Sequence, residues 1–422
     1  MFATIDTMSL YQRLIYLYYG LLSRFAAGRA LFSEPWPRLL VLDFSYEGTS
    51  GHHHALNKLL TSAGKEAGWH VHVLANRNIA PSLLDSNTDP LFTRGTYGAV
   101  GKPKQARKKM RRTIRSFVKD MLEAGLDRIP ADTTVLIHTA SAPHILATVG
   151  FLSLAKRKCP TNIYLMLPPD FDAASPAQAE QRRQYEQAFR LAAGHPHVRF
   201  LCENRLLKAA YQGLGCEHIA LLDLPCRLPD TVFERPRTGR MNFLFIGDPR
   251  PEKGLQLILD AIPLLEPLAG RITIKLLLTH PEKSRSIAPL LEGREFVELV
   301  AKPFFSEAEY FQALGQADCV LLPYDPQAYL LKNSNMVSEA LGCGTPVIVP
   351  PGPNSLSDYC KATGTSVHVE MKDHSPEGFA QAIGNFLTQA PALQSKASLL
   401  RQQIIESRDP RHFIDRIARI PA

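Results

Sequence analysis

Short apolar runs alternate with amphipathic stretches of helical spacing from about residue 38 onward. This alternation is typical of β-α units that form parallel sheets. The runs fall into two consecutive sets. In the first set the predicted strands are 39–44, 71–75, 135–138, 163–167, 198–202 and 219–222. In the second set they are 243–246, 272–278, 296–299, 319–322, 347–349 and 366–369. The pattern predicts an α/β protein with two Rossmann-like domains.

The stretch between the two sets is the best candidate for an interdomain linker. Residues 225–240 carry three prolines, with Arg235, Arg237 and Arg240 near the end of the stretch, a composition that is typical of exposed connections. A chain of 422 residues also suits two large domains. We therefore predict an N-terminal extension, two domains and a C-terminal helical segment that is long enough to return to the first domain. The predicted bounds are 1–37, 38–236, 237–395 and 396–422.

Two basic stretches in the N-terminal half could contact an anionic surface. Residues 10–32 have apolar side chains at helical spacing and no acidic residue, which fits either an interfacial helix or a helix packed on its own protein. The second stretch surrounds an apolar stripe of Ala106, Met110, Ile114, Val118 and Met121. Its eight cations are Lys102, Lys104, Arg107, Lys108, Lys109, Arg111, Arg112 and Arg115. Such a run is either a solvated helix face or a lipid-binding one, and nucleic acid is not expected because no aromatic residues accompany it.

Composition restricts the class of protein only slightly. The 48 Lys and Arg exceed the 40 Asp and Glu by eight, which suits anionic partners without identifying one. The seven cysteines include no C-x-x-C pair, so neither a disulfide scaffold nor a zinc ribbon is indicated. No apolar run is long enough for a transmembrane helix. We expect a cytoplasmic protein, and peripheral contact with the inner face of the membrane stays open.

The first candidate site follows the first predicted strand. A loop containing Gly48 and Gly51 leads from residues 39–44 to a helix that begins near His52. Such a loop binds ligands in open α/β sheets, but it lacks the G-x-G-x-x-G of a dinucleotide site. Three adjacent histidines at 52–54 suggest a metal, yet consecutive helix residues point in different directions. Residues 170–172 read Asp-Phe-Asp, which we interpret as a loop. We predict a polar, substrate-facing loop, no metal and no cofactor.

The second candidate site combines two loops of the second domain. Residues 247–254 follow a strand and contain Arg250 and Lys253, which could hold a diphosphate through charge-assisted hydrogen bonds. Farther along, Asn333 or Ser334 is a good N-cap for a helix whose free N–H groups could face the same diphosphate. Glu339 lies about one turn into that helix, where it could bind ribose hydroxyls or simply favour the helix N-terminus.

These motifs resemble a known family. Residues 247–254, Leu322-Pro323 and the stretch from Glu339 to Ile348 are similar to the nucleotide-binding domain of the retaining, nucleotide-sugar-dependent glycosyltransferases of group 1 type, which have the GT-B fold. The resemblance covers roughly residues 240–350 and extends more loosely to the opening strand and the 48–54 loop. It implies two Rossmann-like domains that face each other across a cleft, with a nucleoside-diphosphate sugar as the substrate.

The resemblance also implies roles for individual residues. Arg250 and Lys253 would hold the donor diphosphate, and Glu339 would hold the ribose. Gly247, Ser334 and Asn335 would line the phosphate site. In the first domain, Gly51 and His52 would face donor and acceptor, and His138 would match a histidine that contacts the sugar. In this family the leaving diphosphate takes the proton of the acceptor, so no separate base is expected.

Three positions depart from the family pattern. The partner of Glu339 in the usual pair of glutamates falls at Leu331, the common arginine after the loop glycine is Asp248, and a frequent glycine is Asn335. The expected activity is transfer of a sugar to a saccharide or lipid-linked acceptor during surface polysaccharide or glycolipid synthesis. A catalytically silent nucleotide-sugar-binding or partner-binding subunit and a sugar-nucleotide epimerase remain open, and a phosphorylase has no specific signal.

Overall fold

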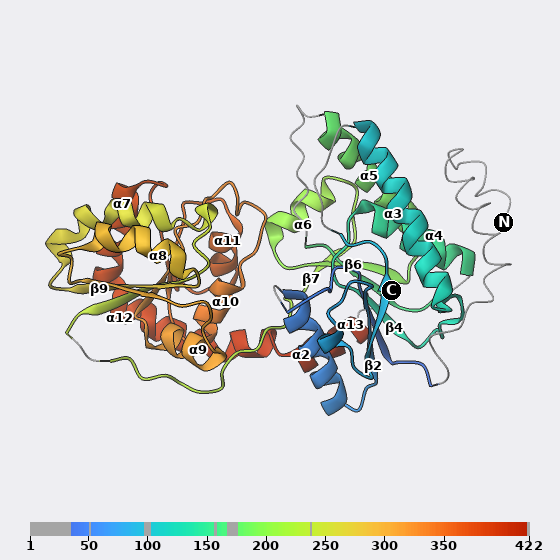
Figure 1. Ribbon diagram of the computed structural model, residues 1–422, viewed down its shortest axis with the longest axis horizontal. Helices are drawn as coiled ribbons and strands as arrows, with labels where there is room; N and C mark the ends of the chain where they lie inside the picture. Colours follow the sequence, from blue (N-terminus) through green and yellow to red (C-terminus); the bar gives the residue numbers. More distant parts are fainter. Residues whose placement is uncertain are drawn as a thin grey trace. The chain divides into compact units, whose positions relative to one another are not determined.

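The computed structural model describes residues 35–49, 52–96, 103–155, 158–166, 176–236 and 239–419. The chain forms two compact units, each built on one parallel sheet (Figure 1). The first unit extends to Pro225, except for residues 204–207, and includes the chain from Pro410. The second unit contains Cys226–Asp409 together with Asn204–Leu207. The predicted α/β class and the two Rossmann-like domains are confirmed.

The first unit contains a seven-stranded parallel sheet with the order β3-β2-β1-β4-β5-β6-β7. Its strands are β1 Leu39–Asp43, β2 Val71–Asn76, β3 Thr88–Phe92, β4 Thr134–Ile137, β5 Thr161–Tyr164, β6 Val198–Cys202 and β7 Ile219–Leu221. Six of them were predicted, with small differences at their ends. The sequence did not predict β3, whose Pro90 cannot donate to a ladder and is tolerated because β3 is an edge strand.

Helices cover both faces of the first sheet. They are α2 His52–Glu66, α3 Pro103–Glu123, α4 Ala142–Ala155, α5 Pro176–Ala192, α6 Arg205–Gln212 and α13 Pro410–Arg419. On one face, α2 and α13 lie side by side (Figure 1), and their apolar residues pack on β1 and β2 in one core cluster. The C-terminal helix α13 therefore returns to the first unit, as predicted, and buries Phe413, Ile414 and Ile417 there.

The second unit contains a six-stranded parallel sheet with the order β10-β9-β8-β11-β12-β13. Its strands are β8 Met241–Gly247, β9 Ile272–Leu278, β10 Val297–Ala301, β11 Cys319–Leu321, β12 Val347–Val349 and β13 His368–Glu370. Each corresponds to one of the six strands predicted for the second domain. The central strands β8, β11 and β12 are largely buried apolar runs, which is why the sequence reveals them well, whereas the edge strands β10 and β13 are only partly buried.

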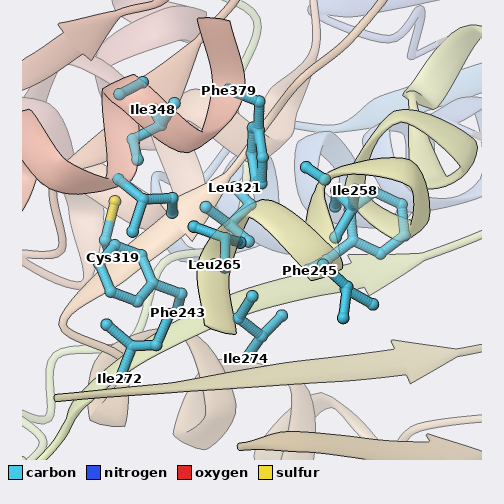
Figure 2. Packing of buried hydrophobic residues seen from close by; sticks show 14 of the residues in the cluster. Phe243, Phe245, Ile258, Leu265, Ile272, Ile274, Cys319, Leu321, Ile348 and Phe379 are labelled. Carbon is cyan, nitrogen blue, oxygen red and sulfur yellow. The ribbon is translucent and has the colours of Figure 1, made fainter. Parts of the chain in front are cut away.

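Helices also cover both faces of the second sheet. They are α7 Leu255–Leu265, α8 Pro281–Ile287, α9 Glu307–Gln316, α10 Asn335–Gly342, α11 Ser355–Ala362 and α12 Pro376–Ser407. Alternate strand residues face opposite sides: Phe243 and Phe245 pack with α7 and α12, whereas Leu244 and Ile246 pack with α9 and α10. Figure 2 shows the first of these clusters, in which Ile258 and Phe379 contribute to the same core as Ile274.

The division between the units differs from the predicted bounds at both ends. We placed the first boundary after residue 236, but Cys226–Pro236 lies with the second unit because its side chains are fixed there. Arg235 donates hydrogen bonds to the carbonyls of Ala317 (3.0 Å) and Gly344 (2.7 Å). We began the C-terminal segment at 396, but α12 runs without a break through Pro391 to Ser407 and packs on α7 and α10.

Of the two basic stretches, the structure describes only the second. The predicted helix at 10–32 lies outside the described residues. The second stretch forms α3, and its stripe of Met110, Ile114, Val118 and Met121 is buried as predicted. The exposed remainder of α3 includes Lys108, Lys109, Arg111, Arg112 and Arg115. Among the residues that the structure describes, no helix combines the length and apolar character that crossing a bilayer requires.

Candidate functional site

The best candidate site of the second unit lies at the carboxyl ends of β8 and β11. These strands are neighbours at the centre of the sheet, and the chain continues from them toward opposite edges, to β9 on one side and to β12 on the other. Such a topological switch point leaves a crevice between the two following loops, where open α/β sheets bind their ligands. Both segments in which the sequence placed a nucleotide site follow these two strands.

Gly254 allows the loop after β8 to lie directly on the loop after β11. Gly254 has φ = +73°, and a Cβ atom there would lie 1.9 Å from the carbonyl oxygen of Pro323. Next to this contact, the amide of Asp325 donates to the carbonyl of Glu252 over 2.9 Å. Only glycine permits this approach, because any side chain would collide with backbone. The Gly247 loop and the start of the β11–α10 loop therefore form one surface.

Lys253 lies over the centre of this surface. Its Nζ atom is 3.4 Å from the position that a Cβ on Gly247 would occupy, and 5.8 Å from the ring centroid of Tyr324. Burial lowers the pKa of Lys253, and the charge of Arg250 acts in the same direction, whereas Glu339 opposes it. An ammonium group in this setting gains from an anionic ligand, because the ligand would compensate the lost hydration and the neighbouring positive charge.

Arg250 is held by acidic neighbours from its own loop. Its Nε atom lies 3.2 Å from Oδ2 of Asp248, and its Nη1 atom lies 3.4 Å from Oε1 of Glu252. The other carboxylate oxygen of Asp248 is 3.5 Å from Nδ1 of His280. Asp248, which replaces the arginine common in the family, thus orients Arg250 and partly compensates its charge. The guanidinium remains partly exposed.

The helix after β11 begins where the sequence predicted. Ser334 is the N-cap of α10, but its side chain makes no capping hydrogen bond. Its hydroxyl interacts instead with Tyr324, whose pKa is raised by burial. The first N–H groups of α10, beginning at the exposed Asn335, therefore lack a side-chain cap. This end of the helix can therefore bind an anionic group.

Glu339 lies one turn into α10 and is hydrogen bonded to Tyr310 of α9. The Tyr310 hydroxyl donates to Oε2 of Glu339 over 2.5 Å. Burial raises the pKa of Glu339, while the hydrogen bond from Tyr310 and the charges of Arg408 and Lys253 oppose that effect. Tyr310 was missed by sequence reasoning because it precedes Glu339 by 29 residues and belongs to no motif. Leu331, at the position of the second glutamate of the family, offers only an apolar side chain.

A histidine cluster occupies the corresponding position in the first unit. Asp43 ends β1, and its carboxylate accepts from Nδ2 of Asn57 (2.7 Å) and pairs with Nδ1 of both His53 (2.7 Å) and His138 (3.2 Å). Burial disfavours the charge of Asp43, but the hydrogen bonds and charges of His138 and His53 outweigh burial and hold its pKa well below the usual range. A lone aspartate that ends a buried apolar strand is the signal that could have pointed to this cluster.

The predicted site residues of the first domain differ in how far they are buried. His138 follows β4 as expected, but its side chain is 0% exposed, so it offers no surface to a sugar. His52 is half-buried at the first position of α2. Gly51 and the Asp-Phe-Asp segment at 170–172 lie outside the described residues.

The two histidines at the start of α2 lie closer together than their directions along an ideal helix suggest. The rings of His52 and His53 lie 4.3 Å apart, and both lie close to His138. His52 is the first residue of α2, so no preceding helical turn restricts its rotamers, and its ring can turn toward its neighbour. The side-chain directions of an ideal helix therefore do not determine which side chains can meet at the first turn of a real one.

Solved structures with the same architecture extend over nearly the whole chain. The Anabaena protein HepE in complex with UDP-glucose matches with a TM-score of 0.57 and 12% identity, covering 90% of this chain and 98% of HepE. The glycotransferase of kitacinnamycin matches with a TM-score of 0.59 and 14% identity, covering 92% and 100%. The lipopolysaccharide outer core galactosyltransferase WaaB, in its apo form, matches with a TM-score of 0.58 and 12% identity. The match covers 89% of this chain and 97% of WaaB. At these identities the likeness establishes the fold.

The sequence of the second unit matches a known family over one domain. Residues 240–389 match the family model described as glycosyl transferases group 1, which runs from the start of β8 into α12. No curated protein sequence matches the chain significantly. Residues 240–389 therefore form a domain that matches the glycosyl transferases of group 1, and the whole chain has the two-sheet architecture of the GT-B structures.

Proposed function

We propose that this chain transfers a sugar from a nucleoside-diphosphate sugar to a hydroxyl acceptor, with retention of configuration at the anomeric carbon. The observation that carries the proposal is the convergence of cationic and helix N-terminal groups at the switch point of the second sheet. Lys253, Arg250 and the uncapped first turn of α10 all belong to the two loops that meet there, and Glu339 lies one turn farther along α10.

Each group has a part in donor binding. The diphosphate lies against Lys253 and Arg250, where each charge-assisted hydrogen bond is worth about 1.5–3 kcal/mol. The amides of the first turn of α10, with Ser334 and Asn335, supply further donors. Glu339 accepts from ribose hydroxyls, and Tyr310 holds its carboxylate in place. Burial raises the pKa of Glu339, so hydroxyl donors from a ligand would stabilise its carboxylate.

The same groups promote the reaction. When the bond between the anomeric carbon and the diphosphate breaks, negative charge develops on the diphosphate, and the fixed positive groups stabilise that charge. The leaving diphosphate then takes the proton of the attacking hydroxyl on the same face of the sugar. This route needs no protein base. Lys253 and Arg250 are the catalytic residues of this proposal.

The acceptor we propose is a saccharide or lipid-linked saccharide in surface polysaccharide or glycolipid synthesis at the cytoplasmic face of the membrane. The exposed cations of α3 support this, because several basic side chains near anionic lipid contribute about 1 kcal/mol each. The structurally similar WaaB acts on the lipopolysaccharide outer core, according to its description. Nucleic acid is not part of the proposal.

One observation favours a second candidate function. Asp248 and Glu252 already pair with Arg250, and Leu331 cannot accept a hydrogen bond from a sugar hydroxyl. A subunit that binds a nucleotide sugar without transferring it would have this arrangement.

Turnover by the purified chain separates the two functions. The chain is incubated with UDP-, GDP- and ADP-sugars and a mixture of saccharide and lipid-linked acceptors, and release of nucleoside diphosphate is followed with and without acceptor. Acceptor-dependent release, with a product whose anomeric proton coupling matches that of the donor, is expected. Binding without release supports the silent subunit. Conversion of the donor sugar without acceptor indicates an epimerase, and an inverted product contradicts retention.

A further inference from the structure

The histidine cluster of the first unit has the composition of a metal site. One ring nitrogen from each of His52, His53 and His138 lies within 4.8 Å of one from both of the others. Imidazole nitrogens are the preferred ligands of zinc and related divalent transition metals. Three histidines from two different segments, the start of α2 and the end of β4, converge here without the spacing of a known metal-binding motif.

The carboxylate of Asp43 orients two of these rings. It pairs with Nδ1 of His53 at 2.7 Å and with Nδ1 of His138 at 3.2 Å. A carboxylate on one ring nitrogen fixes the tautomer, so that the other nitrogen, Nε2, carries the lone pair that a metal requires. Histidine ligands of metal ions are regularly supported in this way. One buried aspartate therefore supplies the outer shell for two ligands.

His138 provides an independent indication of a ligand. Its side chain is completely buried, and its Nε2 atom has no hydrogen-bond partner among the residues that the structure describes. A buried polar nitrogen without a partner costs about 1–3 kcal/mol. A bound ion at this nitrogen would remove that cost.

The cluster lies where the topology of the first sheet provides a ligand site. β1 and β4 are neighbours, and the chain leaves β1 toward β2 on its other side. Asp43 ends β1, and His138 directly follows β4. This is the switch point of the first sheet. The positive end of the α2 dipole by itself disfavours a bound cation. The ionised carboxylate of Asp43 lies beside the rings, and its negative charge offsets this effect.

We propose that His52, His53 and His138 bind one divalent transition metal ion, with zinc as the best fit, and that Asp43 supports the site from the outer shell. Zinc–nitrogen distances of about 2.0–2.1 Å place the nitrogens of a tetrahedral site roughly 3.4 Å apart. The half-buried His52 therefore moves toward the two buried rings when the ion binds. Three histidines leave the fourth position open for water or a hydroxyl of a substrate. The proposal does not depend on the donor site of the second unit.

Metal titration of the full chain tests this directly. The tag-free protein is treated with a chelator and titrated with Zn²⁺ by calorimetry, and with Co²⁺ by visible absorption, which reports tetrahedral nitrogen coordination. One ion per chain is expected. His52→Gln and His138→Gln should each weaken zinc binding at least about 100-fold, and Asp43→Asn about 10- to 100-fold. His54→Gln is the matched control, because His54 neighbours the cluster but pairs with Tyr46, and it should bind zinc normally.

Circular dichroism and thermal melting establish that each variant is folded, and His52→Gln is the decisive variant because its half-buried ring is the least important for packing. The proposal is overturned if the chain binds less than one tenth of an equivalent of Zn²⁺. It is also overturned if His52→Gln and His138→Gln bind zinc as tightly as His54→Gln.

Discussion

The hydroxyl of Tyr310 donates a hydrogen bond to Oε2 of Glu339 and so joins α9 to the helix that begins at the donor site. Because burial disfavours the charge of Glu339, the tyrosine supplies part of the stabilisation that water would otherwise give. We expect Tyr310→Phe to lower the free energy of unfolding by about 1–3 kcal/mol, measured by urea denaturation. In a Glu339→Gln background the loss should be clearly smaller. Equal losses in both backgrounds would show that the two side chains are not coupled.

The role that we propose for Glu339 in nucleotide recognition can be separated from its role in the fold. Glu339→Gln should weaken binding of a nucleoside diphosphate by about 1–3 kcal/mol, because hydrogen bonds from ribose hydroxyls to a charged carboxylate are lost. The same change should have much less effect on a 2′,3′-dideoxynucleoside diphosphate. Calorimetry with both ligands measures the difference. Glu298→Gln, on the exposed strand β10, serves as control. If both ligands lose equal affinity, Glu339 is structural.

Acid should destabilise the first unit through His144. Burial lowers the pKa of this histidine to about 3, against about 6.5 when unfolded. Above pH 6.5 neither state binds the proton, and between pH 6.5 and 3 only the unfolded state does. The free energy of unfolding therefore falls as the pH decreases, by about 1.4 kcal/mol per unit for this group.

His144→Phe is the variant that tests this contribution, because the His144 ring stacks on Phe44 at 4.2 Å and a phenyl ring can do the same. Urea unfolding at pH 7 and pH 5 should show a smaller loss of stability in the variant than in the parent. The same loss in both proteins would assign the acid sensitivity to other groups.

Membrane contact can be tested through the exposed face of α3. Replacing Lys108, Lys109, Arg111 and Arg112 by Gln should abolish co-sedimentation with anionic vesicles at low salt, because binding depends on charge that a Debye length of about 10 Å screens at 0.1 M. A control variant removes as many exposed cations elsewhere on the first unit: Lys58, Lys65, Arg128 and Arg190. The control should still bind the vesicles. No preference for anionic over neutral vesicles would mean that α3 is only a solvated face.

Strands, loops and caps that depend on local pattern could be predicted from the sequence. β9 and β12 were located correctly because runs of mostly apolar residues are a local signal. The start of α10 was expected after Asn333 or Ser334 from residue type, and it follows Ser334, although the Ser334 side chain makes no capping hydrogen bond. β3 was missed because Pro90 interrupts its pattern, and its strand character comes from pairing with β2. Tyr310 and Asp43 were missed for a related reason: each acts through a partner that only the folded chain brings near.

The candidate sites show the same contrast. Arg250, Lys253 and Glu339 were predicted as site residues because the loops after β8 and β11 carry recognisable spacing, and their roles stay predictions. The contact of His52 with His53 and His138 could not be predicted, since it depends on rotamers at the first turn of α2 and on the adjacency of β1 and β4. Sequence patterns assign candidate functional residues to particular helices, strands and loops. Only the tertiary structure determines which of their side chains lie next to one another.

Calorimetric titration of UDP, GDP and ADP into the wild-type chain and two variants tests the central claim most directly. At least one nucleoside diphosphate should bind the wild type, and Arg250→Ala and Lys253→Ala should each weaken that binding by about 1.5–3 kcal/mol. Lys275→Ala, which removes an equally charged side chain from β9 of the same unit, should leave the affinity unchanged. If none of the nucleotides binds, or if both loop variants bind as well as Lys275→Ala, the loops after β8 and β11 do not form the donor site.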